Sequence, residues 1–120
     1  MKAPTKPDGR LLLILLAATA AVYANSLPGI LFWDSEVLIL NNVFLRSWSY
    51  LPDIWSTSVM AGGGQVTNYY RPIPITIFLA LYQLWGPSAL AYHAFTVLCH
   101  LAAAALLFFW IRRLADQKTA

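Results

Sequence analysis

Asp34 and Glu36 are two carboxylates separated by a single residue and preceded by the aromatic pair Phe32 and Trp33. A carboxylate among aromatic side chains at a membrane surface is partly desolvated, which raises its pKa and makes it a better general base. Two carboxylates at this spacing could also share a divalent cation through their oxygen atoms. The alternative is a solvated acidic pair that caps a helix beginning near Val37. Composition alone favours this structural alternative.

Arg71 is a second candidate, within the sequence Tyr69-Tyr70-Arg71-Pro72. A guanidinium group can bind a phosphate through two parallel hydrogen bonds, so Arg71 could hold the phosphate of a lipid. The alternative is a cation that only reaches toward lipid headgroups while its stem lies along apolar surface. The two interpretations are evenly balanced.

A third group consists of His93, Thr96 and His100, whose spacing places them on one stripe of a helix. Polar side chains within an apolar helix usually face protein or water rather than lipid. His100 could ligate a haem or a chlorophyll-type cofactor, but a hydrogen bond to a neighbouring helix is the commoner role of such a residue. Ala102 and Ala105 add small side chains that let another helix approach. We expect a helix-packing face here, with a cofactor face as the less favoured alternative.

The composition indicates that these candidates belong to an integral membrane protein. Hydrophobic residues make up 59% of the 120 residues and charged residues 11%, against about 25% charged in soluble domains. A soluble chain of this length could not bury so much apolar surface.

Cys99 is the only cysteine, which excludes a disulfide scaffold and a cysteine-rich metal site. We expect no metal centre. The net charge of +3 comes from two terminal clusters rather than from a nucleic-acid-binding surface.

Two segments, residues 11–27 and 90–111, are apolar and long enough to cross a bilayer as helices. Basic residues precede the first segment and follow the second: Lys2, Lys6, Arg10, Arg112, Arg113 and Lys118. Because Lys and Arg next to a span stay in the cytoplasm, both termini are expected to be cytoplasmic. A cleavable signal peptide ending at Ala24 is the alternative for the first segment, but we favour a retained span.

Between the spans we expect an external loop over residues 28–71 and an interfacial helix over residues 72–85, which is too short to cross. Pro72 and Pro74 suit the first turn of that helix. Within the loop, residues 41–55 predict short surface helices broken by Pro52, and residues 62–64, all glycine, predict a flexible point. The prediction is therefore an all-α membrane protein, a single module over residues 1–120. Its cytoplasmic tails are residues 1–10 and 112–120.

Several short sequences, in this order along the chain, also resemble a known family. They are Tyr23-Ala24-Asn25-Ser26-Leu27-Pro28-Gly29, Phe32-Trp33-Asp34, Asn41, Tyr70-Arg71-Pro72-Ile73, Tyr82-Gln83-Leu84-Trp85-Gly86, Ala91-Tyr92-His93, His100-Leu101 and Arg112-Arg113-Leu114. This ordered set resembles the N-terminal segment of GT-C fold membrane glycosyltransferases, most closely the O-mannosyltransferase-like proteins with tetratricopeptide repeats. In that family the segment comprises the first span, the first external loop and the second span.

The resemblance implies transfer of a sugar from a polyprenyl- or dolichyl-phosphate carrier to an acceptor hydroxyl on the external face. Asp34 would then be the general base or a metal-linked acid, with Glu36 beside it, and Arg71 would lie near the donor phosphate. The cofactors implied are a polyprenyl-phosphate sugar and a divalent cation. At the position directly after the first acid, where the family often has a second one, this chain has Ser35.

Catalysis requires groups held on several rigid elements that exclude water, and two spans cannot enclose both a donor and an acceptor. We therefore expect a small two-span subunit that packs into a larger membrane complex and is not catalytic alone. The alternative is the N-terminal module of a GT-C glycosyltransferase. The expected partners are membrane lipid and other transmembrane subunits, not nucleic acid, and the expected location is a bacterial inner membrane.

Overall fold

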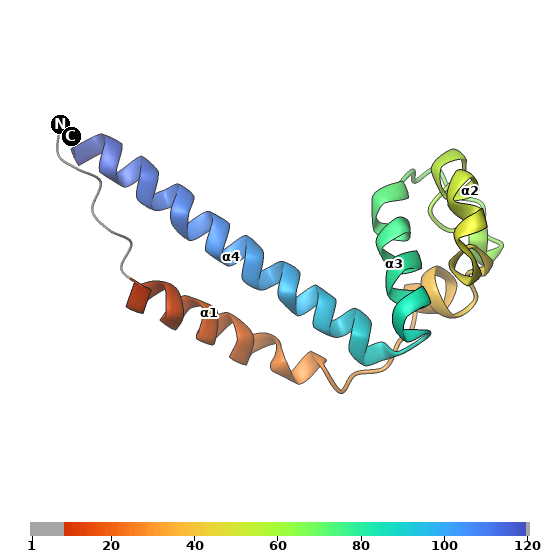
Figure 1. Ribbon diagram of the computed structural model, residues 1–120, viewed down its shortest axis with the longest axis horizontal. Coiled ribbons are helices and arrows are strands. Elements are labelled where there is room, and N and C mark those ends of the chain that lie inside the picture. The colour runs from red at the N-terminus through yellow and green to blue at the C-terminus, as the bar shows by residue number, and fades with distance from the viewer. Residues whose placement is uncertain (1–8, 120) are drawn as a thin grey trace. The chain divides into compact units, whose positions relative to one another are not determined.

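The computed structural model describes residues 9–119, with side chains for residues 9–115, and this part of the chain is helical without strands (Figure 1). The main helices are α1 (Gly9–Tyr23), α2 (Leu51–Ser56), α3 (Pro72–Trp85) and α4 (Ala89–Thr119). Short helical turns lie between them: η1 (Ala24–Ser26), η2 (Glu36–Leu40), η3 (Val43–Arg46), η4 (Trp48–Tyr50) and η5 (Ala61–Gly63). The predicted all-α fold with two candidate spans is confirmed.

The chain divides into two compact units. The span unit contains α1, η1 and α4 from His93 onward, and the loop unit is Pro28–Tyr92.

The first candidate span consists of α1 and η1 and covers Gly9–Ser26. It is apolar, and none of the residues of α1 is buried. The helical segment ends with a hydrogen bond of 3.2 Å from the Leu27 N–H to the Ala24 carbonyl, just before Pro28. The predicted bounds of 11–27 agree with this helix to within two residues.

The second candidate span lies in α4, over Ala89–Ala115. The predicted span over residues 90–111 falls within this segment. The helix continues through Arg112 and Arg113 to Thr119, so most of the predicted tail over residues 112–120 extends α4. Arginine, leucine and alanine are strong helix formers, and no Gly or Pro follows to stop the helix.

The predicted external loop and interfacial helix form the loop unit, which has a core of its own. Its buried side chains come from η2, η3 and the N-cap residue of η3, from α2 and α3, and from the first turn of α4: Ile39, Asn42, Leu45, Ile54, Ile75, Leu79, Leu81 and Tyr92. Helix α3 has the predicted bounds of 72–85, with proline in its first turn as expected. It buries Ile75 and Leu79, four residues apart on one face, against the rest of the unit.

Pro52 lies close to the point where one short helix ends and the next begins, since η4 ends at Tyr50 and α2 begins at Leu51. It occupies the first turn of α2, where a proline's missing N–H would have had no partner within the helix. The prediction of short helices around it is correct, since η3, η4 and α2 follow one another through this stretch.

The glycines of residues 62–64, where the sequence predicted a flexible point, lie in a close-packed turn. Gly62 is buried in η5, and a Cβ atom there would overlap the Asn42 side-chain oxygen. A Cβ atom on Gly63 would lie 2.5 Å from the Val37 carbonyl oxygen. Gly64 has a φ of +78°, a conformation that side chains disfavour. Glycine therefore serves close packing and a tight turn here.

Candidate functional site

Asp34 and Glu36 lie in one tight turn, which we call the carboxylate turn, and both are exposed. The turn begins with a bond of 2.9 Å from the Glu36 N–H to the Trp33 carbonyl. It widens into the π-helical turn η2, where the Asn41 N–H donates to the Glu36 carbonyl at 2.7 Å. Such wide turns occur often at functional sites.

The side chains of this turn do not cap it. Ser35, at the N-cap position of η2, makes no capping hydrogen bond. No side-chain hydrogen bond or ion pair of Asp34 or Glu36 occurs within residues 9–115. Their oxygen atoms are therefore available to a cation, a substrate or water, but nothing in the described chain orients them.

The buried side chain of Asn42 anchors the end of the carboxylate turn. Its exposed fraction is 0%. Its amide group donates to the Leu38 carbonyl, and its oxygen accepts from the Phe44 N–H, both at 3.0 Å. Gly62 packs against this oxygen, and Gly63 packs against Val37 of η2. The turn η5 therefore lies directly against η2 and the Asn42 side chain that follows it. Sequence reasoning did not identify Asn42, although asparagine before a helical turn is a common N-cap.

Arg46 is a second residue that sequence reasoning missed. Its guanidinium lies 4.8 Å from the centre of the Tyr82 ring and donates to the Tyr82 hydroxyl. It also donates to the Leu40 carbonyl at 2.9 Å, at the end of η2. The side-chain amide of Gln83, the residue after Tyr82, donates to the Leu45 carbonyl at 2.8 Å. Tyr82 and Gln83, which contributed to the family resemblance, thus connect α3 to η3, and Arg46 connects η3 to the end of η2.

Arg71 is exposed directly before α3, and its guanidinium lies 5.6 Å from the centre of the Tyr69 ring. The neighbouring Tyr70 hydroxyl donates to the Trp55 carbonyl at 2.7 Å, which holds this segment against α2. No hydrogen bond or ion pair joins Arg71 to Asp34 or Glu36 in the described part of the chain. The predicted acid and the predicted phosphate ligand are therefore not in direct contact within the described residues.

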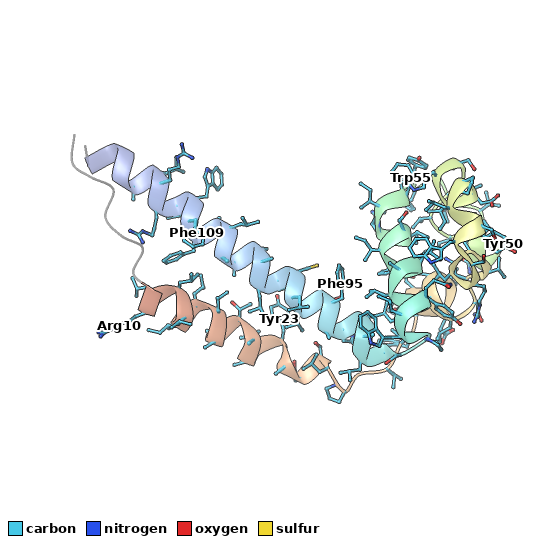
Figure 2. All side chains as sticks on the ribbon, in the orientation of Figure 1. Arg10, Tyr23, Tyr50, Trp55, Phe95 and Phe109 are labelled. Carbon is cyan, nitrogen blue, oxygen red and sulfur yellow. The ribbon has the colours of Figure 1, made fainter. Side chains whose placement is uncertain are left out.

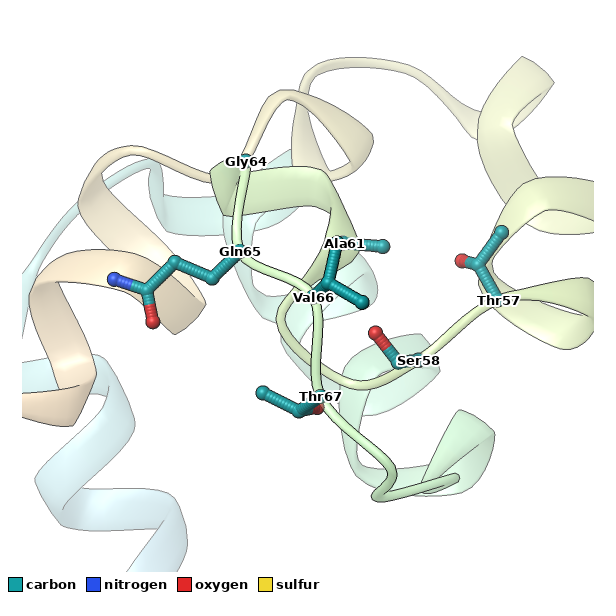
Figure 3. Close-up of a pocket in the computed structure, with 7 residues that line it drawn as sticks. All are labelled: Thr57, Ser58, Ala61, Gly64, Gln65, Val66 and Thr67. Carbon is teal, nitrogen blue, oxygen red and sulfur yellow. The ribbon is translucent and has the colours of Figure 1, made fainter.

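The loop over residues 57–69 encloses an open hollow of about 530 Å³ (Figure 3). A bond of 2.8 Å from the Val59 N–H to the Tyr69 carbonyl closes this loop. The hollow is lined by uncharged residues: Thr57, Ser58, Ala61, Gly64, Gln65, Val66 and Thr67. The predicted carboxylates and Arg71 are not among them. Gln65 extends away from Thr57 and Ser58. The Thr67 hydroxyl oxygen is covered and has no hydrogen-bond partner within the described residues.

His100 of the predicted stripe contacts α1. The Tyr23 ring points from α1 toward α4 (Figure 2) and stacks on His100, with ring centres 4.1 Å apart and planes inclined by 7°. The expected partner of His100 is therefore a residue of this same chain. Thr96 and Ala102 are exposed, whereas Ala105 is partly covered. The Nε2 atom of His93 is covered and lacks a hydrogen-bond partner among residues 9–115.

These observations define a class: a helical chain with two helices long and apolar enough to cross a membrane, joined by a packed helical unit. Within the residues described, no group of three His, Cys, Asp or Glu side chains lies close enough to hold a metal ion. Comparison with protein-family models, with curated proteins and with solved structures finds no match. The resemblance to GT-C glycosyltransferases therefore stays a prediction.

Proposed function

We propose that this chain is a two-span integral membrane subunit that packs into a larger membrane complex and is not catalytic alone. One observation carries the proposal: almost none of the residues of the candidate spans is buried. The buried share is 0% for Gly9–Ser26 and 6% for Ala89–Ala115. Apolar surface of this extent is rare on soluble proteins and indicates contact with lipid or with another protein.

The exposed surface of α4 supports a protein partner in addition to lipid. Ala102 lies exposed on α4 between Leu98 and Leu106, which are four residues away on the same face and are also exposed. In a bilayer, helices associate through small and weakly polar side chains, because apolar side chains gain nothing by leaving lipid for protein. The proposed docking face of α4 is therefore the one that carries Ala102.

The proposed orientation places both termini in the cytoplasm and the loop unit outside, in a bacterial inner membrane. It is supported by Arg10 at the start of α1 and by Arg112 and Arg113 near the end of α4. The charged residues of the loop unit are few and mixed in sign: Asp34, Glu36, Arg46, Asp53 and Arg71.

Gentle detergent extraction from native membranes, followed by native mass spectrometry, tests the proposal. We expect the chain to be extracted with other transmembrane subunits, and Ala102→Leu to reduce that association. Ala17→Leu is the matched control, because it makes the same change at an exposed position of α1. Recovery of the wild-type chain only as a lipid-bound monomer would contradict the proposal.

A second candidate function is favoured by the exposed carboxylate turn. We infer that, if the chain is the N-terminal module of a GT-C glycosyltransferase, Asp34 is the group that meets the substrates. The support is that Asp34 and Glu36 are exposed and unpaired within the described chain, shortly after the first candidate span.

Transfer of sugar from a polyprenyl-phosphate donor, measured on native membranes, tests this second function. Asp34→Asn is expected to abolish transfer while the complex still assembles. Asp53→Asn, which changes another exposed acid of the loop unit, should leave transfer intact. Unchanged transfer in the Asp34→Asn variant would remove Asp34 from the mechanism.

A further inference from the structure

Three large apolar side chains are exposed shortly after the first candidate span. We call residues 30–33 the aromatic loop. The exposed fractions of its side chains are 75% for Ile30, 62% for Phe32 and 80% for Trp33. The same unit fully buries Leu45 and Leu79, so it contains an apolar core from which the aromatic loop is left out.

Trp33 also has a disfavoured backbone conformation. Its φ of 58° is the one positive value at a non-glycine residue among those described. Bulky side chains rarely adopt this conformation. The carboxylate turn fixes it through bonds from the Ser35 N–H to the Phe32 carbonyl and from the Glu36 N–H to the Trp33 carbonyl. Because the exposed indole has little contact within the unit to offset the strain, a contact outside the chain is the natural compensation.

The membrane lies within reach of this loop. As a helix of 1.5 Å per residue, Gly9–Ser26 is about 27 Å long, slightly shorter than a hydrocarbon core of about 30 Å. A short span draws its flanking residues toward the bilayer. Trp33 follows Ser26 by seven residues, a separation of at most about 25 Å. No charged residue lies between Arg10 and Asp34, so no charge must be desolvated when the loop enters the interface.

We propose that the aromatic loop inserts into the headgroup layer of the bilayer, with the Trp33 ring at the boundary of the acyl chains. Tryptophan suits this layer because its ring is apolar and its N–H can still reach a polar partner. Asp34 then lies at the water-facing side of the same layer. This inference rests on the proposed membrane location of the first span.

Depth-dependent fluorescence quenching tests the insertion. The full chain is reconstituted in phosphatidylcholine vesicles whose acyl chains carry bromine near the headgroups or near the bilayer centre. One variant keeps only Trp33 and another keeps only Trp110, with the other four tryptophans replaced by phenylalanine. Trp110 lies in α4 within the second candidate span, so it reports whether the chain is in the membrane at all.

We expect Trp33 emission to shift to shorter wavelength on reconstitution, to lose quenching by aqueous iodide, and to be quenched more by shallow than by deep bromine. If Trp110 is quenched by bromine while Trp33 stays accessible to iodide, the insertion is overturned and the membrane location stands. If neither tryptophan is quenched by bromine, the membrane location itself fails. Protection of Trp33 from iodide without bromine quenching would indicate a protein contact and would also overturn the insertion.

The single substitution Trp33→Phe provides the same answer without removing the other tryptophans. The wild-type emission that is lost in this variant belongs to Trp33. That difference spectrum should show quenching by shallow bromine, whereas a difference spectrum quenched only by iodide would overturn the insertion.

Discussion

The loop unit and the candidate spans use the same apolar residue types in opposite ways. Leu45 and Leu79 in the loop unit have exposed fractions of 0%, whereas Leu13 in α1 and Leu106 in α4 have exposed fractions of 68% and 71%. The loop unit is therefore stabilised by its own core. The spans must be stabilised by what surrounds them. Substitutions of matched residues in the two regions test this difference.

Leu79→Ala should destabilise the loop unit strongly, because it leaves a cavity in the core of that unit. We expect its free energy of unfolding to fall by about 2–5 kcal/mol. Leu106→Ala removes the same atoms from an exposed position, where we expect a change within about 0.5 kcal/mol. Denaturant titration of the chain in detergent micelles, followed by near-UV circular dichroism, measures both. Equal losses would mean that the core of the loop unit is not what distinguishes the two regions.

Gly62→Ala should be the next largest effect, since the added methyl group overlaps the buried Asn42 side chain. We expect a loss of about 1–3 kcal/mol in the same titration. At Gly64 a Cβ atom meets nothing within 4 Å, but the φ is +78°, so Gly64→Ala should cost about 1 kcal/mol from backbone strain alone. A harmless Gly62→Ala would restore the prediction that these glycines provide flexibility.

The ring stack between Tyr23 and His100 should give the smallest effect, and it belongs to the span unit alone. A double-mutant cycle with Tyr23→Ala and His100→Ala should give a coupling energy of about 0.5–1.5 kcal/mol. Thermal unfolding of α1 and α4 in micelles, followed by far-UV circular dichroism, provides the four values. A coupling energy of zero would mean that the stack does not hold α1 to α4.

The features that the sequence predicted correctly depend on local signals. A long apolar run defines each span, and proline at the start of a short apolar run defines α3, because helix length and proline geometry need no distant partner. The continuation of α4 beyond the predicted span was not predicted, because the two arginines mark where a span meets water and not where its helix ends. Arg112 and Arg113 are good helix formers, and the helix passes through them.

The features that the sequence did not predict depend on residues far apart in the chain. Gly62 is close-packed because Asn42 lies against it, and Arg46 is held by Tyr82, 36 residues later. Asp34 and Glu36 were identified by type and spacing, and their exposure agrees with an accessible acidic pair. Their chemistry stays a prediction, since an exposed carboxylate without a partner is not by itself evidence of catalysis.

The loop closed by Val59 and Tyr69 offers a place to tag the protein without disturbing its core. Val66, near the tip of this loop, is 98% exposed. Exposed loop tips tolerate insertions well, because lengthening a closed loop costs little entropy. A short epitope inserted after Gln65 should therefore leave the fold intact and report sidedness: an antibody should label it on intact spheroplasts if the loop unit is external, and only after permeabilisation if it is cytoplasmic.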